Sequence, residues 1–289
     1  MTSSITTRRF SRADGLSLVA DVGGNPEAPA VILLHGGGQT RHSWGKAMDE
    51  LVDRGYFALT LDARGHGDSA WSLEGNYGLE ALSADLRGVI ATLHSPPALV
   101  GASMGGATAL YTVGNSSDPI ASALVLVDIV PRVEQAGSAR IQAFMRSHQD
   151  GFETFEDAVN AVAEYYPHRP RPKDASGLKK NLRQRADGRY HWHWDPRILS
   201  SPQRLEPPQF FDALEQAAAR VRIPSLLVRG LQSDIVSEQG VAALRDKLQG
   251  LEVFNVAEAG HMVAGDKNDA FNTGVLDFLG RHMPPLDHG

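Results

Sequence analysis

Ser103 is the residue of this 289-residue chain whose surroundings best suit covalent chemistry. It lies at the centre of the sequence GASMG, with Gly101 before it and Gly105 after it. An apolar run precedes this stretch, and a helical pattern follows it. A turn that lifts a side chain from a strand end onto a helix start forces an unusual backbone angle, and flanking glycines relieve the crowding. We therefore expect Ser103 to be a nucleophile rather than an ordinary residue at a strand-to-helix junction.

A serine hydroxyl attacks efficiently only when a base takes its proton, and histidine is the usual base. Among the eleven histidines, His261 is the strongest candidate. It follows the last apolar run, so a parallel sheet would bring it to the same edge as Ser103. The order serine, acid, histidine along the chain also accompanies the G-x-S-x-G motif.

Two aspartates are candidates for the acid that orients His261. Asp234 follows the apolar run at 224–230, and Asp128 ends the run at 123–128. Either carboxylate would lie at the carboxyl end of a strand and could hold the imidazole. We expect Asp234 to be the acid, and Asp128 is the alternative, which would otherwise shape the entrance to the segment that follows it.

The glycine-rich turn LLHGGGQT is the candidate site for stabilising negative charge on a reacting oxygen. Glycines let a backbone approach a ligand without an intervening side chain. An oxyanion hole needs at least two N–H groups aimed at the oxygen. We expect the amides of Gly37 and Met104 to form it, with Gly36 and Gly38 as close alternatives to Gly37.

The elements that must position these residues alternate along the chain. Continuous apolar runs are typical of parallel strands covered by helices on both faces. Such runs occur at 30–34, 57–62, 97–102, 123–128, 224–230 and 251–256, with helical spacing between them. The series predicts an α/β fold with a doubly wound, mostly parallel sheet. A hairpin that turns at Asp14 and Gly15 would add an antiparallel edge.

The alternation stops between residues 131 and 221, where helical patterns surround Phe144, Phe155 and Phe210 and proline-rich connectors separate them. We expect this segment to be a helical lid over the strand ends. The core domain would then comprise residues 1–130 and 222–289. The pattern Thr154-x-x-Asp157 predicts a capping box at the start of one lid helix.

Composition narrows the classes of partner. The formal net charge is −6 and no long basic run occurs, which argues against nucleic acid and against a membrane surface as partners. The first fifteen residues lack the apolar core of a signal peptide, so we expect a cytoplasmic protein. Zero cysteines exclude disulfides and thiolate catalysis.

Several residues near these motifs are candidates for contact with a substrate. Gly38 belongs to the glycine turn, and Trp44 follows it. Met262 follows His261, and Trp192 lies in the aromatic stretch YHWHWDP. That stretch also spaces His191 and His193 two apart, but no third ligand is evident, so we expect no metal.

Taken together, the motifs make the chain similar to the α/β-hydrolase-fold enzymes. LLHGGG, LDARGHGDS, GASMGG, RGLQSD and AGHMVAGD occur in the order and at the spacings of that family. The resemblance implies that the lid lies between the sixth and seventh strands of the family fold. It also implies structural rather than catalytic roles for His35, Asp62, Arg64 and Gly65.

The expected function is hydrolysis of an ester, lactone or thioester through an acyl-enzyme on Ser103, without metal or organic cofactor. The resemblance leaves a C–C bond hydrolase or a cofactor-free haloperoxidase as alternatives that would use the same triad. A binding protein of this fold with little turnover is a third hypothesis. The aromatic lid favours a small, moderately apolar substrate, and nothing in the sequence indicates the oligomeric state.

Overall fold

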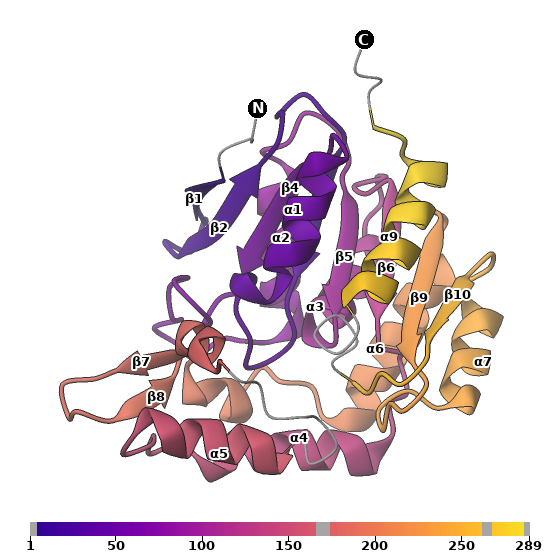
Figure 1. The fold of residues 1–289 in the computed structure, drawn as a ribbon. Coiled ribbons are helices and arrows are strands. Elements are labelled where there is room, and N and C mark those ends of the chain that lie inside the picture. Colours follow the sequence, from indigo (N-terminus) through magenta and orange to yellow (C-terminus); the bar gives the residue numbers. More distant parts are fainter. Residues whose placement is uncertain (1–4, 166–173, 262–267, 286–289) are drawn as a thin grey trace.

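Eight strands form a single sheet in the computed structural model, which describes residues 5–165, 174–261 and 268–285 (Figure 1). The strand order is β1-β2-β4-β3-β5-β6-β9-β10. The pairs β1–β2 and β2–β4 are antiparallel, and the other five pairs are parallel. The strands span Thr6–Ser11 (β1), Ser17–Gly23 (β2), Ala30–Leu34 (β3), Phe57–Asp62 (β4), Ala98–Ala102 (β5), Ala123–Val127 (β6), Ser225–Gly230 (β9) and Glu252–Val256 (β10). The predicted fold class is thereby confirmed.

Helices cover both faces of the sheet. The helices α2 (Leu79–Ile90), α3 (Met104–Gly114), α6 (Pro207–Arg220) and α7 (Glu238–Lys247) bury their apolar faces in one core cluster. On the opposite face, α1 (Gly45–Asp53) and α9 (Asn268–His282) lie over a second cluster. This three-layer arrangement explains why the central strands read as unbroken apolar runs, since both of their faces are covered.

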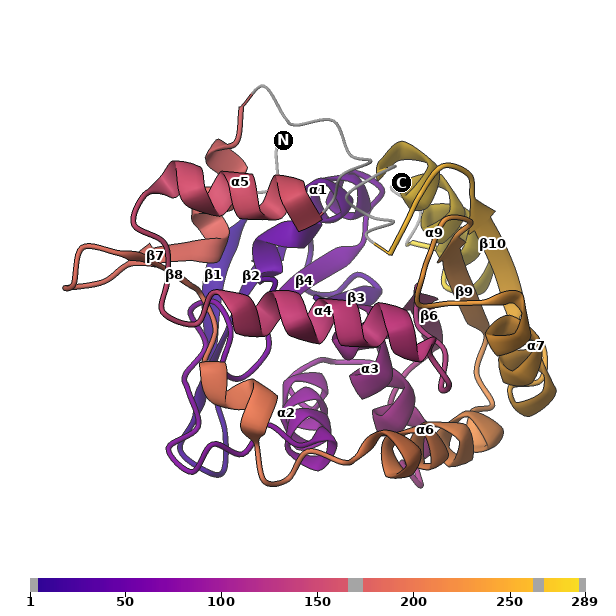
Figure 2. The ribbon, with the colours of Figure 1, turned by 90° about the horizontal axis from the view of Figure 1, so that it is seen from below.

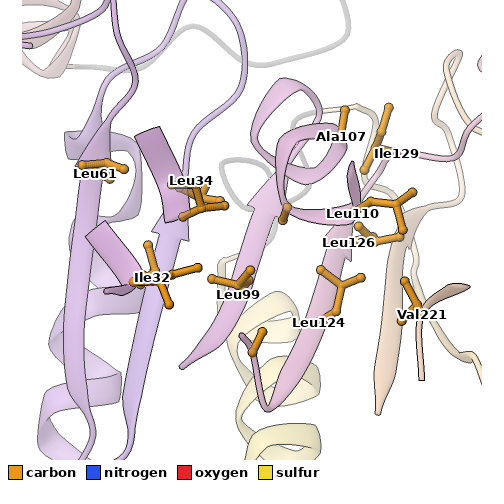
Figure 3. Close-up of a cluster of buried hydrophobic side chains, with 14 of the residues drawn as sticks. Ile32, Leu34, Leu61, Leu99, Ala107, Leu110, Leu124, Leu126, Ile129 and Val221 are labelled. Atoms are coloured by element: carbon orange, nitrogen blue, oxygen red, sulfur yellow. The ribbon is translucent and has the colours of Figure 1, made fainter. Parts of the chain in front are cut away.

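The core places the strand ends firmly. Every residue of β3 and of β6 is buried, and side chains from β3, β5 and β6 interleave beneath α3 (Figure 3). Fully burying one Leu or Ile side chain contributes about 1.5–3 kcal/mol. The loops that leave these strands therefore start from a rigid base.

The predicted hairpin at the amino-terminal edge is confirmed. Its two strands pair from Thr6 opposite Val22 to Ser11 opposite Ser17. Gly15 has a φ of +81° at the turn, a conformation that costs glycine little.

The segment between β6 and β9 crosses the carboxyl ends of the central strands (Figures 1 and 2). It contains α4 (Gln135–Ser147), α5 (Phe155–Tyr165), the hairpin β7 (Leu182–Gln184) and β8 (Tyr190–Trp192), and short 3₁₀ helices at Ser176–Asn181 and Pro196–Ser200. β6 and β9 are the sixth and seventh sheet strands along the chain. The capping box is confirmed, because Thr154 Oγ1 accepts from Asp157 N at 3.1 Å and Asp157 Oδ2 accepts from Thr154 N at 3.0 Å.

Two features of this segment differ from the expectation of a helical lid over residues 131–221. The segment includes a β-hairpin, whose three-residue strands are too short to give a clear alternating pattern. Helix α6 also packs against α3, and Leu214, Ala217 and Ala218 of α6 are fully buried in the main core. α6 is therefore part of the core layer rather than a cover over the strand ends.

No helix within the described residues is both long and apolar enough to span a bilayer.

Candidate active site

The turn between β5 and α3 holds Ser103 in the conformation that its sequence predicts. Ser103 has φ +46° and ψ −112° and immediately precedes the helix. A Cβ atom on Gly101 would lie 2.5 Å from the backbone of Gly105, and one on Gly105 would lie 2.4 Å from the carbonyl oxygen of Leu34. Only glycine fits at these two positions, so the packing of the turn requires both flanking residues.

The same turn is tied to the end of the neighbouring strand. Ser103 N donates to the carbonyl oxygen of Val127 at 3.1 Å, and Asp128 N donates to that of Val228 at 2.8 Å. These two bonds continue the ladder beyond the strand ends from β5 to β6 and on to β9. The loop residues that follow the three strands are thus held side by side at one edge of the sheet.

His261 pairs with Asp128 at this edge. Its Nδ1 lies 2.8 Å from Asp128 Oδ2. The carboxylate is completely buried, and the imidazole side chain is 13% exposed. Because a carboxylate accepts from Nδ1–H, Nε2 of the neutral ring is left as the acceptor. The imidazole is therefore in the tautomer that a general base requires.

The Asp128 carboxylate has two further donors. Gly230 N donates to Oδ1 at 3.1 Å, and Ser233 Oγ donates to Oδ2. Ser233 Oγ in turn accepts from the amides of Ile235 and Val236, at 3.1 and 3.2 Å. A buried carboxylate needs such donors to remain charged. Ser233 is a site residue that the sequence analysis missed, and its only signal was its position beside Asp234.

The expected pairing of Asp234 with His261 is wrong. The Asp234 carboxylate instead forms an ion pair with Arg140 of α4, at 2.8 Å, and its side chain is 37% exposed. In the loop after β9, Ser233 turns inward and caps the two amides that follow, so the next side chain points away from the carboxylate of Asp128. The alternative acid, Asp128, is the one that contacts the imidazole.

The glycine turn after β3 leaves one amide available. Gly36 N donates to Gln39 Oε1 at 2.9 Å, Gly38 N donates to His66 Nε2 at 3.1 Å, and Gln39 N donates to Gly36 O at 3.1 Å. Gly37 N has no acceptor among the described residues, and a Cβ on Gly37 would meet nothing within 4 Å. Of the three glycine amides, Gly37 is thus the one open to a ligand.

This free amide lies in a turn that adjoins Ser103. A Cβ on Gly36 would lie 3.5 Å from Ser103 Cβ. Met104 N, at the first position of α3, likewise finds no acceptor in the described part of the chain. Unpaired amides at a helix start attract negative charge.

The residues that the family resemblance makes structural are engaged in contacts of that kind. His35 Nε2 accepts from Ala63 N at 3.0 Å. The Asp62 carboxylate accepts from Arg41, and Arg64 forms an ion pair with Asp85. The side chains that make these contacts are all buried: His35, Arg41, Asp62, Arg64 and Asp85.

The residues expected to contact substrate have different surroundings. Trp44 is 2% exposed and packs on Phe271 in the core beneath α1 and α9, which argues against a role at the strand ends. Trp192 is buried against Phe152, with ring centres 5.3 Å apart. Met262 lies outside the described residues.

Gly38 faces the segment that crosses the strand ends. A Cβ on Gly38 would lie 3.5 Å from Met145 Cε and 3.8 Å from Trp194 Nε1. These two side chains cover the glycine turn and were not singled out from the sequence. Their apolar character was visible, but their position depends on how α4 and β8 dock.

The two histidines of YHWHWDP do not converge on a metal site. His191 Nε2 lies 2.9 Å from Asp187 Oδ2, whereas His193 contacts Arg183. Across residues 5–165, 174–261 and 268–285, no group of three potential metal-ligating side chains occurs.

Comparison with known proteins agrees with this geometry. A family model described as the alpha/beta hydrolase fold matches residues 29–267. The chain belongs to the α/β-hydrolase family. The two relatives described next are named as an esterase and a lipase.

Two relatives match this α/β-hydrolase over most of their length. Esterase Rv0045c of Mycobacterium tuberculosis is 32% identical over 265 residues, which cover 86% of this chain and 83% of that protein. The sn-1-specific diacylglycerol lipase ABHD11 of Mus musculus is 32% identical over 282 residues, which cover 89% and 82%.

Solved structures share the fold. A structure of the M. tuberculosis esterase Rv0045c superimposes with a TM-score of 0.77 and 28% identity, covering 96% of this α/β-hydrolase and 93% of that chain. The crystal structure of E-2-(acetamidomethylene)succinate hydrolase gives a TM-score of 0.83 at 22% identity, covering 96% and 99%.

Proposed function

We propose that this α/β-hydrolase cleaves carboxylic esters through an acyl-enzyme intermediate on Ser103. The observation that carries the proposal is the strained turn at Ser103, with φ +46°, at the same edge of the sheet as a histidine whose Nδ1 is bound to a buried carboxylate. Backbone strain at a polar residue is retained where it serves chemistry. The names of the relatives, an esterase and a diacylglycerol lipase, support ester hydrolysis.

In the first half of the reaction, His261 Nε2 takes the proton of the Ser103 hydroxyl while Oγ attacks the carbonyl carbon. The carbonyl oxygen becomes an oxyanion that accepts hydrogen bonds from Gly37 N and Met104 N. Collapse of this tetrahedral intermediate breaks the ester C–O bond, and the imidazolium gives its proton to the departing alcohol.

In the second half, His261 takes a proton from water as the water oxygen attacks the acyl carbon. A second oxyanion forms and collapses, which releases the carboxylic acid and returns the proton to Ser103 Oγ. Asp128 holds the ring orientation and stabilises the imidazolium in both halves. Lactones and thioesters present the same carbonyl and fit the same steps.

The surroundings of the glycine turn favour a moderately apolar substrate. Met145 and Trp194 lie over Gly38, and both belong to an aromatic-rich cluster together with Phe144 and Trp192. We propose that residues 135–200 act as the lid of the site and that this cluster forms part of the wall next to the reacting carbonyl.

The experiment that tests the proposal combines turnover with labelling of the nucleophile. A panel of p-nitrophenyl esters and lactones of graded acyl length is assayed with the unmodified protein, Ser103→Ala and the exposed-serine control Ser117→Ala. We expect turnover by the unmodified protein and by the control, and a loss of at least about 10³-fold in Ser103→Ala. A fluorophosphonate should label the first two proteins stoichiometrically at Ser103, with loss of fluoride, and leave Ser103→Ala unlabelled.

Ester turnover that survives in folded Ser103→Ala would overturn the proposed nucleophile. Stoichiometric labelling without multiple turnovers on any ester, lactone or thioester would instead favour a binding protein. Faster cleavage of a vinylogous diketone, or halide-dependent bromination with a peracid, would move the reaction to the alternatives that use the same residues.

A further inference from the structure

His66 lies behind the glycine turn, on the loop that follows β4. His66 is buried, with only 1% of its surface exposed. Nε2 accepts from Gly38 N at 3.1 Å, and Nδ1 lies 3.2 Å from the carbonyl oxygen of Arg64. A carbonyl can only accept, so Nδ1 carries the proton and Nε2 is a bare acceptor. The ring is therefore built into the fold as a neutral acceptor for one particular amide.

The Gly38 amide fixes the conformation of the glycine turn next to Gly37. Gly38 N belongs to the peptide unit that joins Gly37 to Gly38, and Gly38 has a φ of +76°. Glycine populates both signs of φ readily, so an unrestrained Gly-Gly peptide can flip. A flip would turn the Gly37 carbonyl to where the Gly38 N–H now points, and it would change ψ of Gly37 and φ of Gly38, two torsions that shape the turn around the Gly37 N–H.

The position of His66 is itself fixed by the segment that crosses the strand ends. Gly67 N donates to His193 O at 2.9 Å, and Asp195 N donates to Gly65 O at 2.8 Å. These backbone contacts make an isolated antiparallel β-bridge between His66 and Trp194. Trp194 Nε1 also lies 3.8 Å from the position of a Gly38 Cβ. Residues 193–195 thus fix the loop that carries His66, and Trp194 adjoins the glycine turn as well.

We propose that His66 is a positioning residue of the oxyanion hole, which fixes the Gly37–Gly38 peptide and so holds the shape of the turn that keeps the adjacent Gly37 N–H aimed at the oxyanion. This inference rests on the proposed function. It assigns to His66 no contact with the substrate. Its contribution is made in the tetrahedral intermediates, where the oxygen is charged.

The acceptor persists over the working pH range. Burial, together with the neighbouring His35 ring at 5.0 Å, lowers the pKa of His66 to about 3. The other ionisable groups that face it are His193, which further disfavours a charged ring, and Asp195, which opposes this effect weakly. Nε2 therefore stays unprotonated at the pH of any ordinary esterase assay.

The test compares His66→Asn with His66→Gln. Asparagine is too short to place an acceptor at the position of Nε2, whereas the glutamine oxygen reaches it. We expect kcat for an ester to fall about 10- to 100-fold in His66→Asn, with KM changed less than about threefold, because one well-placed donor to an oxyanion is worth up to about 10²–10³ in kcat. His66→Gln should restore most of the loss.

A transition-state analogue separates positioning from general damage. A trifluoromethyl ketone forms a tetrahedral oxyanion on Ser103, so its affinity should fall in His66→Asn by the same factor as kcat/KM. The matched control is His282→Asn, which removes a histidine that pairs with Glu252 at the start of β10, at the opposite edge of the sheet from the glycine turn. This control should keep both kcat and inhibitor affinity.

The result that would overturn the inference is wild-type kcat and inhibitor affinity in folded His66→Asn. An equal loss of kcat in His66→Asn and His66→Gln, with a lowered melting temperature in each, would also overturn it in favour of a purely structural role. Should His66→Asn not fold, ¹⁵N NMR of the histidine rings in the unmodified protein decides. The Nδ1–H tautomer of His66, unchanged between pH 5 and 9, supports the proposal, and the Nε2–H tautomer contradicts it.

Ser103→Ala, assayed in parallel, keeps the two proposals distinguishable. Turnover that persists in Ser103→Ala defeats the proposed function. Turnover that is lost there but intact in His66→Asn defeats only the role of His66.

Discussion

The loops after β6 and after β9 each offer an aspartate at the same edge of the sheet, and the fold treats the two in opposite ways. Asp128 is completely buried, has φ +47° and accepts from His261, Ser233 and the amide of Gly230. Asp234 is 37% exposed and paired with Arg140, which is itself 53% exposed.

The difference teaches that proximity to a strand end is not enough to make a carboxylate an orienting acid. A carboxylate that must stabilise an imidazolium acts most strongly where water is excluded, and there it needs donors to remain charged. The loop after β9 supplies such donors to Asp128 through Gly230 and Ser233. It therefore supports the acid from the neighbouring strand instead of providing one.

The largest expected effect is that of Asp128→Asn. The amide cannot accept from Nδ1–H in the same way and favours the wrong tautomer of His261, so we expect kcat to fall about 10³- to 10⁴-fold. Steady-state kinetics on the best ester of the panel measure the loss, and circular dichroism checks the fold. A loss of less than about tenfold in a folded variant would erase the contrast between the two loops.

A transplanted acid sharpens the comparison. Ser233 Oγ already contacts Asp128 Oδ2, the same oxygen that His261 contacts. In the Asp128→Asn background, Ser233→Asp would bring a carboxylate to this point and keep a cap for the amides of Ile235 and Val236. We expect kcat to recover about tenfold over Asp128→Asn alone. Asp234→Glu in the same background is the control and should recover nothing.

Removing the hydroxyl alone should have a moderate effect. Ser233→Ala deletes one of the donors to the buried carboxylate and uncaps two amides. A hydrogen bond to a charged group contributes about 1.5–3 kcal/mol, part of which water can replace at this half-buried position. We expect kcat/KM to fall about three- to tenfold with a lowered melting temperature. Equal kinetics in Ser233→Ala and the unmodified protein would show that Gly230 N suffices.

The smallest effect is expected at the exposed pair. Asp234→Asn and Arg140→Ala should each leave kcat within about twofold, and the free energy of unfolding should change by less than about 1 kcal/mol, as for other exposed ion pairs. Chemical denaturation and ester kinetics measure the two quantities. A loss of kcat in Asp234→Asn comparable with that in Asp128→Asn would reverse the assignment.

Much of the fold could be predicted from the chain because its signals are local. Continuous apolar runs indicate strands that are covered on both faces, and each of the six runs became a strand of the sheet. The Asp14-Gly15 turn and the Thr154 capping box were equally legible, since their contacts join residues only a few positions apart. By contrast, the docking of α6 against α3 depends on contacts between residues about a hundred positions apart, such as Gly114 and Ala217.

The sequence by itself determined the turn at Ser103, because the G-x-S-x-G motif predicts both the strained backbone of the serine and the glycines that permit it. Only the tertiary structure decided which aspartate meets His261 and which amide of the glycine turn is left free. Those outcomes depend on the direction in which neighbouring side chains leave a loop: Ser233 turns inward, so Asp234 does not, and His66 engages Gly38, so Gly37 remains open. Sequence spacing carries no record of such directions, because they are fixed by packing between segments that are distant along the chain.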